Sequence, residues 1–485
     1  MLIFFVLGIP LFLGLAAFLL PKPKYCGLAN IAGYLAVLLI SIFMFSHASG
    51  IRPVSWSGFF YLDSLSLFFL FVISVVAFAA SLYSLSYIER DLKSGLISER
   101  KAKFYYIFFN LFCFTMFFVP AVNNLGMLWV AIEMTTLVSA FLVGFYNTKQ
   151  SVEAAWKYII ICSVGIIFAL LGIILFSSAF SNTGGIKSLN WSYMVSAAGR
   201  FDPNIVKIAF IFILIGFGTK AGLAPMHTWL PDAHSQAVAP ISALLSGVLL
   251  KTAIYAILRF AIITNKALGT QFCGNLMMFL GLLSLAVACV FLLVQKDLKR
   301  LLAYSSIEHI GIISLGFGLG TSLGFLGALL HVFNHAVNKS LMFFSAGDIV
   351  ANYKKHNMNA IRGVVQALPF CGIMAILGTF ALTGFPPFSI FMSEMMIIFA
   401  LFMKGNYLTC ALLLLFIVVI FAALIFHLSK VLFGHKPKEM AASGEPLAAK
   451  IAFIFLFIQI SLIGILLPWI FKDGFSLAIK VLQGA

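Results

Sequence analysis

Long apolar runs dominate this sequence and constrain its fold more than any motif does. A helix that crosses the hydrocarbon core of a bilayer needs roughly 20 mostly apolar residues. Fourteen such runs follow one another, near residues 2–20, 27–46, 62–87, 104–121, 125–145, 154–180, 205–224, 238–259, 273–294, 303–319, 321–349, 368–401, 407–433 and 448–471. Only 9% of the residues are charged, against roughly 25% in a soluble domain. We therefore expect an all-α polytopic membrane protein with about fourteen transmembrane helices.

The formal charge of +16 could suggest a nucleic-acid partner. The Lys and Arg residues, however, lie mostly in the short links between apolar runs, where basic residues mark the cytoplasmic side. Numbered alternately from outside, the inside links carry nineteen of them and the outside links nine, Arg259 among the latter. This bias predicts an integral protein, in a prokaryotic cytoplasmic membrane, with both termini outside. Lys22 and Lys24 follow the first run, so we expect a retained helix and not a cleaved signal peptide.

The cysteines do not predict a redox centre. There are seven, none forms a C-x-x-C pair, and nearly all lie inside apolar runs. Packed thiols are therefore expected, without an iron–sulfur cluster or a zinc site on cysteine. The sequence also lacks a Walker loop and a G-x-G-x-x-G after a strand. We expect no catalytic residue, cofactor or metal on this chain, so redox chemistry would have to come from partner subunits.

Two short segments resemble each other. GTKAGLAP at 218–225 is similar to GTFALTGFP at 378–386, and each follows an apolar run and ends in a proline that should break a helix. The copies are five predicted helices apart, an odd number that would place them upside down relative to each other. Inverted repeats with broken helices are a common transporter design.

Three ionisable residues lie where lipid should surround them. Glu133, Lys220 and Lys251 all fall deep within apolar runs. Each such charge costs about 2.5–3.5 kcal/mol at the bilayer centre, so the fold must compensate it. A Glu and a Lys that face each other favour each other's charged forms, and a lysine whose partner moves can act as a proton switch. The alternative is a static ion pair that locks helices together.

The series continues along the chain. His309 lies in AYSSIEHIGIISLGFG, and His331, His335 and Lys339 lie in ALLHVFNHAVNKSLMFF. A spacing of four places the last three along one face of a helix. Imidazole titrates near neutrality and can both donate and accept a proton, which suits a relay. Because the series crosses many helices, we favour proton conduction over a structural role.

The same pair of histidines could in principle hold a metal ion. His331 and His335, spaced by four residues, could chelate zinc. No carboxylate or cysteine ligand is obvious nearby in the sequence, and Lys339 would repel the ion. The sequence therefore disfavours a metal there.

Further candidates flank the predicted breaks. Glu394 follows Pro386 and Pro387, His227 follows Pro225, and His427 lies in the next apolar run. Broken backbone inside a membrane survives when it is buried in protein or lines a wet cavity. We expect Glu394 to end the path, and His227 and His427 to be secondary candidates that could equally be packed core residues.

The motifs resemble those of a known family. GTKAGLAPMHTWLPDAHSQAVAPISALLSGVLLKTAIYAILR, DLKRLLAYSSIEHIG and HVFNHAVNKSLMFFSAG resemble the signature of the antiporter-like proton-translocating subunits. These occur in respiratory complex I, multisubunit cation/proton antiporters and group 4 hydrogenases. The resemblance covers roughly residues 60–430. GFPPFSIFMSE is most similar to hydrogenase 4 component F and to formate hydrogenlyase-type complexes, and Glu394 stands where many members carry lysine.

The resemblance implies an organisation and a set of roles. It implies N-terminal helices in 1–103, five-helix repeats in 104–260 and 273–433, and a last helix in 448–485. Glu133 and Lys220 would form the family's buried pair. Lys251 and His309 would connect it to the end of the path.

The expected function is proton translocation as a membrane subunit of a redox-driven complex. Partners would be other membrane subunits and a peripheral arm with iron–sulfur proteins. The alternatives are a subunit of a sodium/proton antiporter complex or of complex I, and a purely structural scaffold. Co-purifying iron–sulfur subunits would favour a redox complex over an antiporter.

Overall fold

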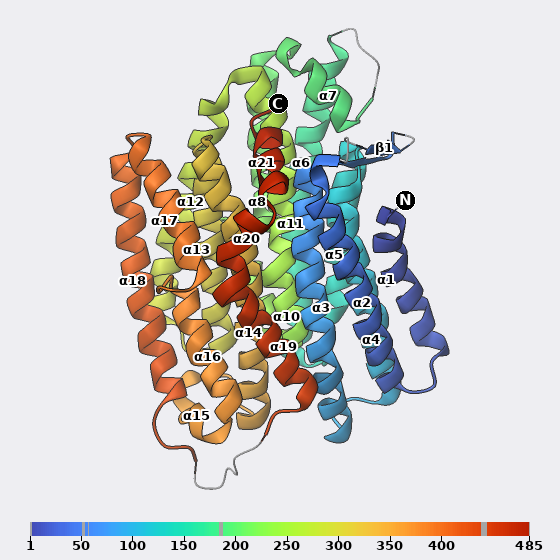
Figure 1. The fold of residues 1–485 in the computed structure, drawn as a ribbon, viewed down its shortest axis with the longest axis vertical. Helices are drawn as coiled ribbons and strands as arrows, with labels where there is room; N and C mark the ends of the chain where they lie inside the picture. Colours follow the sequence, from blue (N-terminus) through green and yellow to red (C-terminus); the bar gives the residue numbers. More distant parts are fainter. Residues whose placement is uncertain (1, 51–53, 57, 184–187, 438–443, 485) are drawn as a thin grey trace.

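The computed structural model describes residues 2–50, 54–56, 58–183, 188–437 and 444–484. It is a bundle of long helices with one small hairpin (Figure 1). The helices are α1 (Leu2–Leu19), α2 (Pro23–Ser46), α3 (Ser64–Lys93), α4 (Glu99–Phe118), α5 (Leu125–Val143), α6 (Lys149–Ser181), α7 (Trp191–Ala197), α8 (Pro203–Ala221), α9 (Trp229–Gln236), α10 (Ala239–Leu244), α11 (Leu250–Leu268), α12 (Thr270–Val294), α13 (Leu298–Gly318), α14 (Ser322–Tyr353), α15 (Val364–Ala367), α16 (Pro369–Leu382), α17 (Ser389–Met403), α18 (Tyr407–Leu432), α19 (Leu447–Ile458), α20 (Gly464–Ile470) and α21 (Lys472–Leu482). The antiparallel hairpin pairs β1 (Val54–Trp56) with β2 (Phe60–Leu62).

Twelve helices in the described part of the chain are long and apolar enough to cross a membrane. The all-α polytopic fold expected from the sequence is thus confirmed. The predicted run 368–401 forms two shorter helices, α16 and α17, and the 32-residue α14 carries polar residues along its length. The count of fourteen spanning helices therefore stays a prediction.

Central and peripheral helices differ in burial. In α3 94% of the most apolar 18-residue window is buried, and in the span made by α10 and α11 all of it is. The corresponding share is 39% in α6 and α12 and 28% in α18. The molecule therefore has a core of helices that lipid does not reach, which is where ionisable side chains can be compensated.

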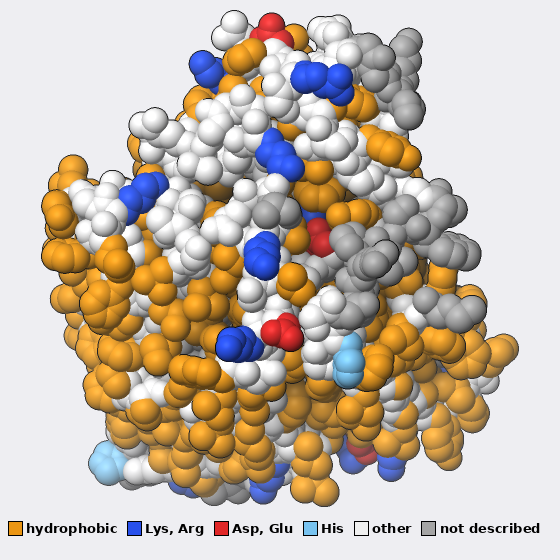
Figure 2. Space-filling model, turned by 45° about the horizontal axis from the view of Figure 1, so that its top comes forward, with side chains coloured by type: hydrophobic (Ala, Val, Ile, Leu, Met, Phe, Trp, Pro, Cys, Tyr) orange, Lys and Arg blue, Asp and Glu red, His pale blue; other side chains and the backbone are white. Residues whose placement is uncertain are grey.

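Hydrophobic and charged surfaces are separated. Hydrophobic side chains cover the flanks, and charged side chains gather on the end of the molecule that comes forward in Figure 2. Both termini lie toward the end that also carries α7 and the hairpin (Figure 1). This distribution fits a bundle whose flanks face lipid and whose ends face water.

Glycines allow two helix pairs to approach closely. On α6, a Cβ at Gly172 would lie 2.8 Å from the Ala209 carbonyl oxygen of α8. Between α12 and α13, a Cβ on either Gly281 or Gly311 would lie 2.7 Å from the carbonyl oxygen of the other. Small residues let membrane helices pack at backbone contact, where dispersion replaces the missing hydrophobic drive.

The two predicted breaks are present. The helix α8 ends at Gly222 in the left-handed conformation (φ 78°), and α9 resumes seven residues later. The helices α16 and α17 are separated by residues 383–388, with Gly384 also left-handed (φ 66°). Each break leaves a helix end beside a buried ionisable side chain, Lys220 at the first and Glu394 at the second. The inverted relation between the halves stays a prediction.

Candidate functional site

Lys220 lies in the last turn of α8 and is 1% exposed. Its Nζ donates to the Thr136 Oγ1 (2.6 Å) and to the Tyr158 hydroxyl (2.7 Å). The Nζ is also 4.7 Å from the centre of the Tyr158 ring. A hydroxyl pair and a ring face therefore solvate the ammonium in place of water.

Glu133 of α5 is half-buried and reaches Lys220 through a hydroxyl. Its carboxylate accepts from the Ser163 Oγ (2.7 Å) and from the Thr136 Oγ1 (3.3 Å), the same hydroxyl that accepts from Lys220. The sequence suggested a direct pair. The structure instead places Thr136 between ammonium and carboxylate, with both of these hydrogen bonds pointing from Lys220 toward Glu133.

Lys251 lies on α11 and is fully buried. It follows a π-helical turn, η4 (Leu245–Leu249), and its Nζ donates to the Ser246 carbonyl oxygen at 2.5 Å. The Ser246 hydroxyl is 2.8 Å from that of Ser306 on α13. A π-turn leaves carbonyl groups outside the regular helical pattern, which gives this lysine an acceptor in the turn directly before it.

Three histidines meet between α13, α14 and α17. The His309 Nδ1 is 2.9 Å from the His331 Nε2, and the His331 Nδ1 is 2.9 Å from the Ser393 Oγ. The His335 ring lies 4.6 Å from the His309 ring, centre to centre. Neither His335 nitrogen has a hydrogen-bond partner among the described residues. The structure thus brings together three of the histidines that the sequence singled out.

Lys339 lies on α14 and is fully buried. Its Nζ donates to the Leu302 carbonyl oxygen (2.8 Å) and to the Ser305 hydroxyl, both on α13. Glu308 of the same helix is 3% exposed and interacts electrostatically with Lys339. Its Oε2 has no hydrogen-bond partner in the described part of the chain. Glu308 is therefore a buried acid that belongs with the predicted series.

Glu394 lies on α17, is 5% exposed and closes the group. Its carboxylate rests against Gly384 in the second break, where a Cβ would overlap it. Ligand atoms of His309, His331 and Glu394 all lie within 4.8 Å of one another. The break between α16 and α17 thus brings the carboxylate to the histidines of α13 and α14.

The two secondary candidates have different surroundings. His227 is 7% exposed, and its ring lies near those of Phe291 and Tyr304. His427 of α18 is only partly covered, and its Nε2 is 3.2 Å from the Leu293 carbonyl oxygen. Their described contacts are with the helix surroundings and not with the histidine cluster, as expected of packed residues.

One buried ion pair was missed by the sequence reasoning. Arg259, which the charge count placed in an outside link, is 3% exposed and makes a bidentate pair with Asp63 (2.6 and 2.7 Å). Its guanidinium also lies 4.5 Å from the centre of the Trp191 ring. The carboxylate caps α3 by accepting from the Ser66 N–H. An acid at the start of an apolar run was the available signal.

A second missed group lies at the other end of α3. The Arg90 Nη1 donates to the Asp348 Oδ1 of α14 (2.9 Å), which also accepts from the Tyr83 hydroxyl (2.8 Å). Lys299, another residue read only as a topology signal, is 4% exposed and donates to the Ala237 carbonyl oxygen (2.9 Å). Asp348 stands inside an apolar run, so the rule that found Glu133 could have found it.

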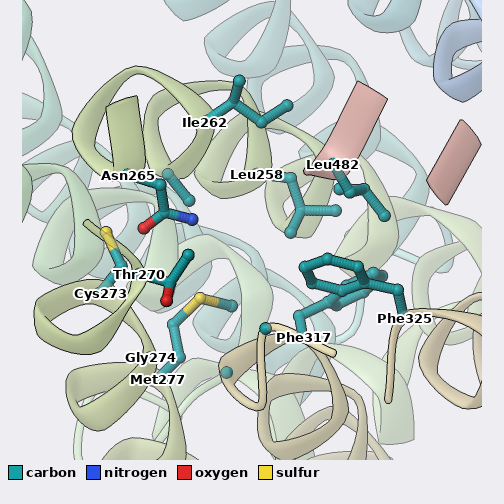
Figure 3. A pocket seen from close by; sticks show the side chains of 13 residues that line it. Leu258, Ile262, Asn265, Thr270, Cys273, Gly274, Met277, Phe317, Phe325 and Leu482 are labelled. Atoms are coloured by element: carbon teal, nitrogen blue, oxygen red, sulfur yellow. The ribbon is translucent and has the colours of Figure 1, made fainter. Parts of the chain in front are cut away.

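A small cavity lies apart from these groups. Its volume is about 20 Å³, enough for one water. Asn265 and Thr270 face Phe317, Phe325 and Leu482 across it (Figure 3). None of the predicted site residues lines it, so the cavity is not part of the candidate path.

Known proteins resemble this chain over most of its length. The family described as NADH:quinone oxidoreductase/Mrp antiporter, TM, matches residues 122–431, and that described as the N-terminus of complex I chain 5 matches residues 52–96. A hydrogenase-4 component F homolog of Methylacidiphilum infernorum is 40% identical over 78% of this chain and 79% of its own length. Hydrogenase-4 component B of Escherichia coli is 32% identical over 69% of this chain, which spans 49% of that protein.

Solved structures share the fold. A chain of the membrane-bound sulfane sulfur reductase, an archaeal respiratory membrane complex, matches with a TM-score of 0.86 and 25% identity over 99% of this chain and 97% of its own. A chain of the Mrp complex from Dietzia matches with a TM-score of 0.85 at 18% identity, covering 99% of both chains. With a family match over more than half of its residues, this chain belongs to the NADH:quinone oxidoreductase/Mrp antiporter family of polytopic membrane subunits.

Proposed function

We propose that this chain conducts protons across a prokaryotic cytoplasmic membrane along its buried ionisable residues. One observation carries the proposal: six basic side chains of the predicted series, on four helices, are buried to 1% exposure or less, namely Lys220, Lys251, His309, His331, His335 and Lys339. Charges there are costly. A purely structural core would be as well served by apolar side chains.

The proposed path begins at the hydroxyl-bridged pair. The Thr136 hydroxyl bridges the two groups, so a proton that enters at Glu133 would pass through it to Lys220 once the lysine is neutral and the hydroxyl has reversed its hydrogen bonds. Lys251 would be the next group, followed by the histidine cluster. Where consecutive groups do not touch, water held by the serine hydroxyls and free carbonyls would bridge them.

Glu394 would end the path, with Lys339 and Glu308 setting the field around the histidines. The His309–His331–Ser393 contacts form a chain of groups that both donate and accept. Imidazole suits this role because its two nitrogens exchange donor and acceptor roles. Glu394 would take the proton at the second break.

The exposed residues at the second break also support the presence of partner subunits in the membrane. Phe385, Pro386 and Pro387 are exposed on the surface of the chain, although they interrupt a membrane helix. Irregular backbone does not face lipid inside a bilayer. A neighbouring membrane subunit would cover this face, as expected for a subunit of a larger complex.

The driving reaction would come from those partners. The similarity to hydrogenase-4 component F favours a redox complex with an iron–sulfur arm. A sodium/proton antiporter complex is the second candidate, because the matching family also includes Mrp antiporter subunits and the Mrp fold is shared. Purification of the native complex separates them, since iron–sulfur subunits should co-purify only in the first case.

The central test compares two lysines of one helix. In the assembled complex in vesicles, Lys220→Ala and Glu133→Ala should abolish proton movement measured with a pH dye, while assembly is retained. Lys207→Ala is the matched control, because Lys207 is exposed on the same helix α8. Normal proton movement in a well-assembled Lys220→Ala variant would overturn the proposal. A static brace predicts lost assembly instead.

A further inference from the structure

We infer that His309, His331 and Glu394 form a binding site for a divalent transition-metal ion such as Zn²⁺. The three side chains come from α13, α14 and α17 and are 0%, 0% and 5% exposed. Two imidazoles and a carboxylate are a ligand set that zinc uses in proteins, with a fourth position left for water. The inference rests on this geometry and not on proton conduction.

The spacing of the ligand atoms suits a single ion. One ligand atom from each of the three residues lies within 4.8 Å of the other two, and without an ion the His309 Nδ1 and the His331 Nε2 are hydrogen-bonded to each other at 2.9 Å. Ligands at about 2.0–2.2 Å from a tetrahedral zinc are roughly 3.4 Å apart. The histidines would separate slightly and the carboxylate would move inward.

A hydrogen bond outside the ligand shell orients one ligand. The Ser393 Oγ contacts the His331 Nδ1, which leaves the His331 Nε2 directed at His309. Metal-bound imidazoles usually have such a partner on the second nitrogen, which fixes the ring and the tautomer. Ser393 directly precedes Glu394, so one turn of α17 would supply both a ligand and the group that orients another.

This site differs from the chelate that the sequence disfavoured. The rings of His331 and His335 are nearly parallel and their centres are 6.5 Å apart. The missing carboxylate arrives from α17, far along the chain from His335, which no local spacing could predict. Lys339 lies two turns from His331, about 12 Å along the helix axis, but its ammonium donates to Leu302 and Ser305 of α13, the helix that carries His309, and it interacts electrostatically with His309. The positive charges of Lys251 and Lys339 would lower the affinity of the site for a cation without abolishing binding.

In the isolated chain, the second break lies beside exposed residues. The Glu394 carboxylate rests against Gly384, and the next three residues, 385–387, are exposed. Since a bound ion takes the nitrogens that exchange protons, zinc should also inhibit proton movement at the concentrations at which it binds.

Binding to the purified full-length chain tests the inference. The background variant replaces His47, His356, His427 and His435, which lie on or near the surface. Zn²⁺ affinity is measured against a chromogenic chelator. We expect one ion per chain and at least a tenfold loss of affinity in His331→Asn and in Glu394→Gln. His335→Asn is the matched control, one turn from His331 on the same helix, and should bind within twofold of the background.

X-ray absorption spectroscopy of the background variant with bound Zn²⁺ identifies the ligands without substituting any of them. Two imidazoles and a carboxylate should surround the ion. Unchanged affinity in His331→Asn and Glu394→Gln, or a coordination sphere with fewer than two imidazoles, would overturn the site. Because binding is measured without transport, a chain that binds zinc but conducts no protons would contradict the proposed function alone.

Discussion

Gly384 controls the position of Glu394. Its backbone is left-handed, and an added methyl group would overlap the Glu394 carboxylate. We expect Gly384→Ala to displace this carboxylate and to reduce proton movement at least tenfold in vesicles. Gly405→Ala is the control: Gly405 is also left-handed (φ 77°), but an added methyl group there would have nothing within 4 Å, so it carries backbone strain alone. Equal transport in both variants would show that Glu394 can move freely.

The Asp63–Arg259 pair should be the most costly single contact to break. Removing one partner of a buried ion pair leaves an uncompensated charge and costs about 3–5 kcal/mol. Asp63→Asn should therefore lower the thermal unfolding midpoint of the purified protein strongly. Glu89→Gln breaks the exposed pair with Lys93 (3.0 Å) and should change the unfolding free energy by about 0.5 kcal/mol or less. Similar midpoints for both variants would contradict this ranking.

At the scale of residues, the sequence predicted the buried ionisable residues whose charge lies inside an apolar run. Lys220, Lys251 and Lys339 were found because they lie too deep in apolar runs to belong to a link between helices, and all three are buried. Arg259 was misassigned because it ends a run, where a snorkelling topology residue would also lie. The Thr136 bridge was not predictable, since it depends on how α5 and α8 are rotated against each other.

Among the helix contacts, the glycine seam between α6 and α8 gives a sharp test. Gly172→Ala would place a methyl group 2.8 Å from the Ala209 carbonyl oxygen and 2.9 Å from Ile213. Overpacking of this kind costs about 1–3 kcal/mol, so the unfolding midpoint should fall. Gly8→Ala in α1 has open space and should be neutral or slightly stabilising, because alanine favours the helix. The reverse order would show that α6 and α8 separate readily.

The elements were predictable where hydropathy or proline defined them. The breaks at Gly222 and Gly384 follow from proline and glycine in otherwise apolar runs. The π-turn η4 before Lys251 was not predicted, because no residue type in the sequence marks it; in the structure the Ser246 carbonyl oxygen in this turn accepts from Lys251, and the Ser246 hydroxyl contacts that of Ser306 on α13. Likewise, α9 was not expected as a separate helix, since its eight residues mix apolar and polar side chains and are too few to show a helical period.

For the whole molecule, the charge bias predicts orientation. Ser94 lies in the link between α3 and α4, and Ser196 lies near the end of α7; both are exposed. In right-side-out vesicles, an impermeant thiol reagent should label Ser196→Cys and should not label Ser94→Cys. All seven native cysteines are buried, which keeps the background low. Labelling of Ser94→Cys alone would reverse the predicted orientation.

Ion pairs connect the two ends of helix α3 to two different helices. Asp63, the N-cap residue of α3, binds Arg259 of α11, and Arg90 in the last turn of α3 binds Asp348 of α14. The helices α11 and α14 fall in the two predicted repeats. A rotation of one repeat against the other would have to break at least one of these ion pairs. These two ion pairs oppose a rigid-body rotation between the repeats and favour gating by movements of side chains or water molecules.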